Sequence, residues 1–130
     1  MNNRHIICTD EAAAPIGPYN QAVKAGNMLF ISGQIAIDPQ SGTLYTGDDI
    51  AEETRRVMEA LKAILTAAGS DFSQVVKSSI FLLDMGVFGT VNEVYARYFD
   101  AAHAPARETV AVVGLPKGAR VEISMIALVS

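Results

Sequence analysis

Hydrophobic and polar residues alternate at every second position in several parts of the chain, which predicts β-strands. The first clear case is residues 28–37, and residues 74–83 form another. Two long apolar runs, residues 109–115 and 121–129, end the chain as two more predicted strands. Residues 116–118, with the sequence Pro-Lys-Gly, separate these two runs with residues typical of a turn.

Two other segments have apolar residues at helical spacing. Residues 49–68 carry a single apolar stripe, which is typical of a helix packed on a sheet. Asp48 or Asp49 can cap the start of this helix, and Gly69 suits its end. Residues 87–101 predict a second helix, whose stripe consists of Phe88, Val91, Tyr95, Tyr98 and Phe99.

The predicted order of elements, β-β-α-β-α-β-β, indicates an α+β fold in which a β-sheet has both helices packed on one face. Residues 12–20 contain two prolines and a glycine, and they predict an irregular loop of functional character. The uncovered face of the sheet would also carry apolar side chains, so we expect it to be buried between subunits. The 130 residues suit a single domain spanning residues 1–130.

Composition and charge narrow the classes of partner. Half of the residues are hydrophobic, 18% are charged and the net charge is −4. Lys and Arg form no cluster, which argues against nucleic acid as a partner. No apolar run reaches the length of a membrane helix, and the polar N-terminus is unlike a secretory signal. We therefore expect a cytoplasmic protein that contacts no membrane.

Metal binding is not indicated by the sequence. Cys8 is the single cysteine, which precludes an intrachain disulfide and a cysteine metal cluster. No spacing of His, Asp and Glu is typical of a metal site. We expect no metal and no cofactor.

Two charged residues stand out in the apolar strands near the C-terminus. Arg107 lies at the mouth of the first run, and Glu122 lies inside the second. Burying a charge is costly unless the charge is paired. A small carboxylate ligand is one possible partner for Arg107, because guanidinium matches a carboxylate in bidentate geometry. The alternative is a surface or interface ion pair, with Glu108 or Asp100 as the partner.

Glu122 has two possible roles. Alternation places it on the same strand face as Ser124, Ile126 and Leu128, so its surroundings are half apolar. Such surroundings favour a raised pKa and a role as general acid or base. The alternative is an ordinary strand residue that faces solvent.

The relative position of these two residues depends on how the last strands pair. In a simple hairpin around residues 116–118, Arg107 would lie opposite Ala127, and Glu122 would be roughly 16 Å away. One chain could not then hold a small ligand with both side chains, and the site would need a second subunit. If the two strands are not neighbours in the sheet, this argument does not apply.

Three further residues are candidates for a pocket. Ser32, next to Gly33, could be a nucleophile, but no histidine is placed to activate it. The alternative is a pair of small residues that allows close backbone approach, which also suits ligand binding. Tyr19 could be a core aromatic or a pocket wall. Asn92, at the edge of the second helix's stripe, could be a capping amide or a ligand contact.

Taken together, six spaced motifs make the chain resemble the RidA/YjgF family of enamine/imine deaminases, also described as the translation-inhibitor endoribonuclease L-PSP family. The motifs follow the family's order over nearly the whole chain. They are residues 14–19, 26–35, 61–69, 90–95, 105–107 and 115–123.

The resemblance implies a chorismate-mutase-like α+β fold and a homotrimer with sites in the clefts between subunits. It implies hydrolysis of reactive enamines such as 2-aminoacrylate and 2-aminocrotonate. These react through their imine tautomers, 2-iminopropanoate and 2-iminobutanoate, to give 2-keto acids and ammonia. It also implies that the reaction needs no cofactor and no metal.

The same resemblance implies roles for individual residues. Arg107 should bind the substrate carboxylate, and Glu122 should position or activate the attacking water. The remaining residues should contact the substrate through side chains or backbone groups: Tyr19, Ser32, Gly33, Asn92 and Thr109. The chain departs from the family where many members have Cys in place of Thr109 and a second acid in place of Ser124.

Two other functions are compatible with the same residues. One is a regulatory module that binds a 2-keto acid without catalysis, and the other is a pathway-specific deaminase of a larger enamine. The presence of both Arg107 and Glu122 favours an enzyme over a sensor.

Overall fold

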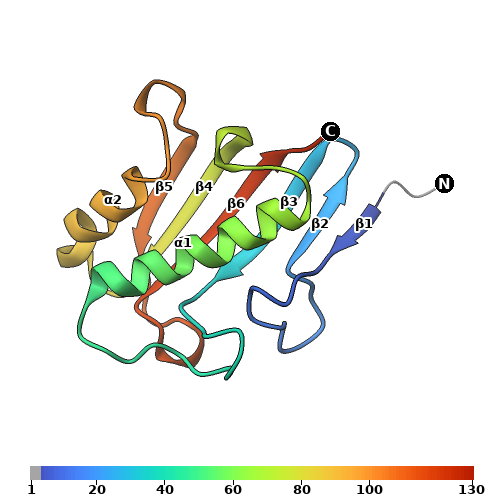
Figure 1. Cartoon of the computed structure of the whole chain (residues 1–130). Coiled ribbons are helices and arrows are strands. Elements are labelled where there is room, and N and C mark those ends of the chain that lie inside the picture. The colour runs from blue at the N-terminus through green and yellow to red at the C-terminus, as the bar shows by residue number, and fades with distance from the viewer. Residues whose placement is uncertain (1–3) are drawn as a thin grey trace.

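One face of a six-stranded sheet carries both helices of this α+β fold (Figure 1). The structure is a computed structural model of the chain, and it describes residues 4–130. The strands are β1 (Arg4–Ile7), β2 (Ala22–Ala25), β3 (Met28–Gln34), β4 (Val75–Leu82), β5 (Ala106–Ala111) and β6 (Val121–Leu128). The helices are α1 (Ile50–Ala67) and α2 (Phe88–Ala96).

The strands lie in the order β1-β2-β3-β6-β4-β5. β4 and β5 run parallel, because the α2 segment connects them, and all other neighbours are antiparallel. β4 separates the last two strands, so the hairpin considered from the sequence does not form. The separation of Arg107 and Glu122 is therefore set by their places on β5 and β6, with β4 between them.

The first helix has nearly the predicted bounds. Asp49 caps it, because its side chain accepts a hydrogen bond from the Ala51 N–H at 3.0 Å. Gly69 follows the C-cap with φ 77°, a left-handed conformation that glycine adopts without strain. Local sequence therefore determines both ends of α1.

The second helix is shorter than residues 87–101. After Ala96 the backbone bonds tighten to three-residue spacing, as in the bond from Tyr98 N–H to the Tyr95 carbonyl. Asp100 then caps a separate short helix by accepting from Ala102 N–H. The aromatic stripe continues beyond the helix, because Tyr98 and Phe99 still pack against the core.

The strands before α1 also differ from expectation. The predicted order has two strands here, whereas the structure has three. β1 is a short edge strand with mostly exposed residues, so it lacks the alternation that identifies a strand. β3 ends at Gln34 rather than at residue 37, after an irregularity in its pairing with β6 between Ile31 and Gln34.

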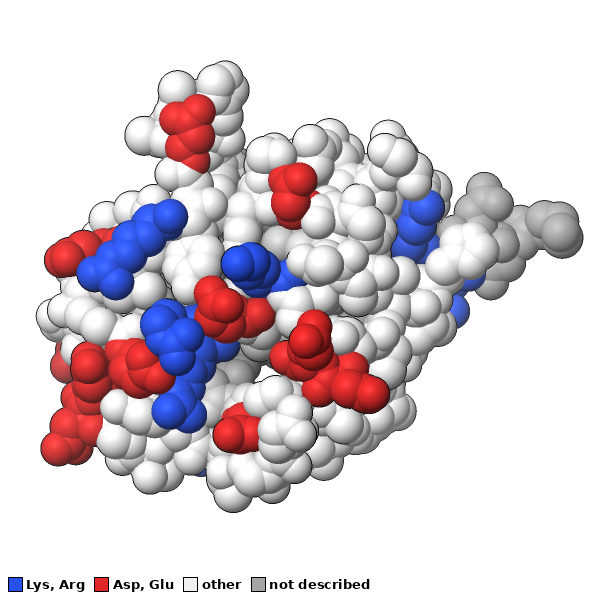
Figure 2. Space-filling model, viewed as in Figure 1, with Lys and Arg blue, Asp and Glu red and all other residues white. Residues whose placement is uncertain are grey.

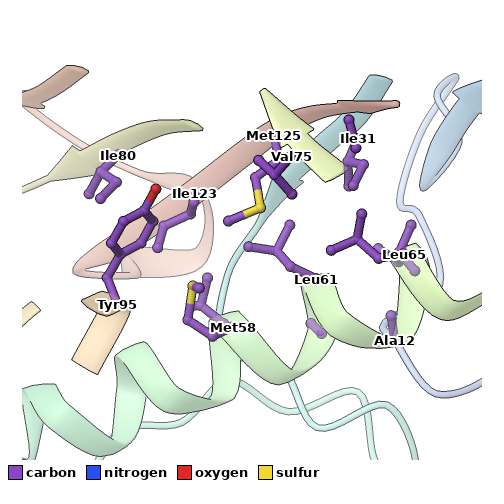
Figure 3. Close-up of a cluster of buried hydrophobic side chains, with 14 of the residues drawn as sticks. Ala12, Ile31, Met58, Leu61, Leu65, Val75, Ile80, Tyr95, Ile123 and Met125 are labelled. Atoms are coloured by element: carbon purple, nitrogen blue, oxygen red, sulfur yellow. The ribbon is translucent and has the colours of Figure 1, made fainter. Parts of the chain in front are cut away.

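The core lies between α1 and the covered face of the sheet. Leu61 and Leu65 project from α1 toward Ile31, Val75 and Met125 of the sheet (Figure 3). Burying an aliphatic side chain of this size contributes about 1.5–3 kcal/mol. This packing fixes the orientation of β6, whose other face is left open.

The open face of the sheet is partly apolar. Phe30 of β3 pairs with Ile126 of β6 and is 46% exposed. Leu128 and Val110 are also exposed on the sheet. No helix among residues 4–130 is long and apolar enough to cross a membrane.

Candidate active site

Glu122 lies in a cavity of about 310 Å³ on one side of β6. The preceding turn contributes Pro116 and Lys117 to the cavity wall. The irregular end of β3 contributes Gly33 and Gln34. The loop predicted at residues 12–20 and the residue just after it contribute Ala13, Ala14, Pro15, Ile16, Tyr19 and Gln21. The segment after β3 contributes Ile35 and Ile37.

Gly33 makes room for the Glu122 carboxyl group. A Cβ atom at Gly33 would overlap both the Oε2 atom and the carboxyl carbon of Glu122. Close approach of a side chain to a strand backbone requires glycine at such a position. The predicted pair of small residues thus has a definite structural purpose at Gly33.

Glu122 is half-buried, and this burial raises the pKa of its carboxyl group. Desolvation disfavours the charged form of a carboxyl group, so the proton is retained to higher pH than usual. A carboxyl group of this kind in a cavity is suited to proton transfer.

Side-chain bonds hold the loop that closes the cavity. Gln21 is 2% exposed, and its Nε2 donates to the carbonyls of Thr9, Ala12 and Ala13 at 2.9–3.2 Å. Its Oε1 accepts from Thr9 N–H at 2.7 Å. One buried amide therefore organises the segment before Tyr19.

Tyr19 and Ser32 differ in their relation to this cavity. Tyr19 lines it and is half exposed, so it is a pocket wall and not a core aromatic. The Ser32 hydroxyl donates to the Asn20 carbonyl at 2.6 Å and does not appear in the cavity wall. Ser32 ties β3 to the loop.

Arg107 lies in a different part of the molecule. Its Nη1 donates to Asn92 Oδ1 at 2.6 Å, and its guanidinium carbon is 5.1 Å from the centre of the Tyr95 ring. It is also 5.6 Å from the centre of the Phe88 ring. An amide and two aromatic faces therefore hold this cation in place.

The partners considered for Arg107 from the sequence are engaged elsewhere. Glu108 pairs with Lys77 at 3.0 Å and accepts from Ser79, and Asp100 pairs with His103 at 2.8 Å. Among the described residues Arg107 has no carboxylate partner. Its positive charge is available to an anionic ligand.

Arg107 lines a second cavity, of about 450 Å³, together with Asn92, Tyr95 and Phe99. Thr109 lies two residues further along β5 and is not part of this wall. Its hydroxyl is buried and has no hydrogen-bond partner within residues 4–130. Thr109 therefore follows Arg107 along β5 without lining the cavity that Arg107 lines.

The two cavities lie on opposite faces of the sheet. Arg107 pairs in register with Ser78, which bonds to Tyr95 of α2, so Arg107 is on the covered face. Glu122 alternates with the buried residues of β6 and is therefore on the open face. Arg107 is level with Met125, so the two side chains are also separated by roughly 10 Å along the strands. One chain cannot bring both to one small ligand.

Sequence reasoning did not identify Gln21, Gln34 or Lys117 as parts of the site. The two glutamines are buried amides that bond to backbone carbonyls, Gln21 to Thr9 and Gln34 to Ser32, and such bonds leave no periodic signal. Lys117 has φ 58°, and a left-handed conformation at a residue other than glycine is a signal only the structure reveals. Within the described part of the chain, no group of three or more His, Cys, Asp or Glu could hold a metal ion.

Comparison with known proteins shows which family the chain resembles. The family model described as endoribonuclease L-PSP matches residues 9–129. Protein DfrA of Myxococcus xanthus is 54% identical over 127 residues, which are 96% of this chain and 95% of that protein. A Mus musculus protein named 2-iminobutanoate/2-iminopropanoate deaminase is 48% identical over 125 residues, which are 96% of this chain and 91% of that protein.

Comparison with solved structures indicates the same family. The crystal structure of a Yersinia pestis protein of unknown function from the conserved Rid family matches with a TM-score of 0.93 and 43% identity. The match covers 97% of this chain and 99% of that one. By sequence and by fold, the chain belongs to the endoribonuclease L-PSP family, which includes the RidA/YjgF proteins.

Proposed function

We propose that the protein is a 2-iminobutanoate/2-iminopropanoate deaminase. The observation that carries this proposal is that the chain has two complementary half-sites: a cation without a carboxylate partner among the described residues, and a half-buried carboxyl group in a cavity. A 2-imino acid offers a carboxylate to the first and an electrophilic carbon to a water held by the second. The name carried by the mouse relative supports the same activity.

In the proposed reaction, water adds to the imine carbon and forms a tetrahedral carbinolamine. Expulsion of ammonia from this intermediate gives the 2-keto acid. Arg107 binds the substrate carboxylate in bidentate geometry, while Asn92 and the aromatic rings hold the guanidinium in position. These contacts exist before the ligand arrives, which lowers the cost of ordering it.

Glu122 positions and deprotonates the water as it attacks, and it passes this proton to the imine nitrogen. It then takes the hydroxyl proton of the carbinolamine and delivers it to the same nitrogen, which leaves as ammonia. Its raised pKa suits both steps, because a stronger base takes the proton more readily. Tyr19 and backbone groups near Gly33 line the substrate's position, and the backbone of Thr109 lies on the side of Arg107.

The proposed active unit is a homotrimer with sites between subunits. Arg107 of one subunit would meet Glu122 of the next, which resolves their placement on opposite faces of the sheet. A heterologous contact of this kind closes into a ring in cyclic symmetry. The exposed apolar residues of the open face, such as Phe30, would be covered in this assembly.

The proposed partners are small imino acids and further copies of this chain, in the cytoplasm and without a cofactor. The proposal includes no nucleic acid and no membrane. On the helix-covered side, Lys and Arg alternate with Asp and Glu and form no basic patch (Figure 2). This charge distribution supports the exclusion of nucleic acid.

A coupled assay tests the proposal. Threonine dehydratase generates 2-aminocrotonate from threonine, and the appearance of 2-ketobutyrate is followed with wild-type protein and with Arg107→Ala. We expect acceleration by the wild type and little by the variant. A wild-type assembly that gives no acceleration would contradict the proposal, and titration with a 2-keto acid would then test a binding module.

A further inference from the structure

An ion pair between the buried Glu53 and the partly buried Arg120 joins the start of α1 to the segment that leads into β6. Glu53 is 1% exposed. Its Oε1 accepts from Arg120 Nε at 2.7 Å and pairs with Nη2 at 2.6 Å. Its Oε2 accepts from the Arg120 backbone N–H at 2.9 Å. One carboxylate therefore fixes both the backbone and the side chain of Arg120.

The same arginine reaches a third segment. Arg120 Nη2 also donates to the carbonyl of Gly47, in the loop before α1. The Glu53–Arg120 pair thus connects this loop, the first turn of α1 and the chain just before β6. Three segments that are distant in sequence meet at one arginine.

The turn before Arg120 forms part of the Glu122 cavity. Pro116 and Lys117 line the wall, and Lys117 has the left-handed conformation with φ 58° and ψ 14°. Such strained conformations persist at non-glycine residues only when the surroundings hold them. Within the turn, Ala119 N–H bonds to the Pro116 carbonyl at 3.0 Å, and Arg120 follows directly.

Glu122 itself lies near the end of a ladder. The pairing of β3 with β6 ends at Gln34 opposite Ile123, so no pair with β3 includes Glu122. On the other side Glu122 pairs with Phe81 of β4. The segment leading into Glu122 is therefore held by β4 on one side and by the bonds to Arg120 at its start.

We propose that Glu53 and Arg120 are positioning residues, which set the cavity wall at residues 116–118 and the direction of the Glu122 carboxyl group. This inference rests on the proposed deaminase function. An ion pair in which one partner is buried is a weak source of stability compared with apolar residues of the same volume. Its multiple bonds define one geometry, which is what a site that places a single water requires.

Enzyme kinetics of Glu53→Gln and Arg120→Lys test the inference in the coupled assay. Gln keeps the shape of Glu53 but removes its charge, and Lys keeps the charge of Arg120 but cannot bond Glu53 and Gly47 in the same fork. We expect kcat to fall about 10- to 100-fold in Glu53→Gln and less in Arg120→Lys. KM should change little, because Arg107 binds the substrate carboxylate from the other face of the sheet.

Glu52→Gln is the matched control. Glu52 precedes Glu53 in α1 but pairs with Arg55 and Arg56 on the helix surface, so its loss should leave kcat unchanged. Amide hydrogen exchange at Gly118 and Ala119 should accelerate in Glu53→Gln and not in Glu52→Gln. If Glu53→Gln does not fold, Arg120→Lys still decides the question.

The outcomes separate this inference from the proposed function. Faster exchange with an unchanged kcat would show that the pair is only structural and would overturn the inference. So would a loss confined to KM, or an Arg120→Lys variant that folds and has wild-type kcat. A wild-type protein without activity would instead overturn the proposed function, and with it any catalytic role for the pair.

Discussion

At the scale of single residues, the contact between Gly33 and Glu122 constrains the site most tightly. The carboxyl group occupies the space in which any other residue at position 33 would place its Cβ. From the sequence, an acid in an apolar strand was enough to single out Glu122. The need for glycine opposite it depends on the pairing of β3 with β6, and no local pattern encodes that pairing.

Replacing Gly33 with Ala should displace the Glu122 carboxyl group and lower kcat about 100-fold, because a small misplacement of a catalytic group has a large kinetic effect. Steady-state kinetics in the coupled assay measure this. Gly89→Ala is the control, since an added Cβ there meets no atom within 4 Å. A Gly33→Ala protein with full activity would show that Glu122 does not act from its position in the structure.

The raised pKa of Glu122 predicts how activity depends on pH. As a base, Glu122 must be ionised, so activity should fall as the pH drops through its pKa. Because burial raises this pKa, the acid limb of kcat/KM should lie above 4.5, the usual value for Glu. A pH profile that stays flat down to that value would exclude Glu122 as the base.

At the scale of elements, prediction succeeded where local rules dominate. The cap at Asp49 and the apolar stripe gave α1 to within one residue at each end. The predicted second helix was too long, because Asp100 caps a separate turn that an unbroken aromatic stripe conceals. The parallel pairing of β4 with β5 could not be derived, since strand neighbours are chosen by packing across the sheet.

Helix α1 should contribute to stability chiefly through its buried stripe. Leu61→Ala should lower the free energy of unfolding by about 2–5 kcal/mol, because it leaves a cavity against the sheet. Chemical denaturation measures this loss. The exposed neighbour Lys62 is the control, and Lys62→Ala should change the free energy by less than about 0.5 kcal/mol. Equal effects at both positions would contradict the packing described for α1.

At the scale of the whole molecule, two features support the proposed assembly. They are the apolar open face of the sheet and the placement of Arg107 and Glu122 on opposite faces. Phe30 is exposed on a face that also carries Glu122, while Arg107 lies on the covered face. The sequence predicted the apolar open face from alternation alone. It could not show that the two charged residues face opposite ways, because that depends on β4 lying between their strands.

Phe30→Asp should weaken assembly, because a charge would have to be buried in the proposed interface. Light scattering should then show a smaller particle than the wild type, and deaminase activity should fall with it. Lys62→Glu, a charge change on the helix-covered side, should leave both unchanged. A wild-type protein that is monomeric in dilute solution would contradict the proposed assembly.

Mixing two inactive variants most directly tests whether each site takes its residues from two subunits. Arg107→Ala and Glu122→Gln are each expected to lose activity, and they are then refolded together in equal amounts. If each site takes Arg107 from one subunit and Glu122 from its neighbour, about a quarter of the sites in the mixture should contain both residues. We expect recovery of about a quarter of the wild-type activity. Mixed assemblies that remain inactive would contradict a site that takes Arg107 from one subunit and Glu122 from its neighbour.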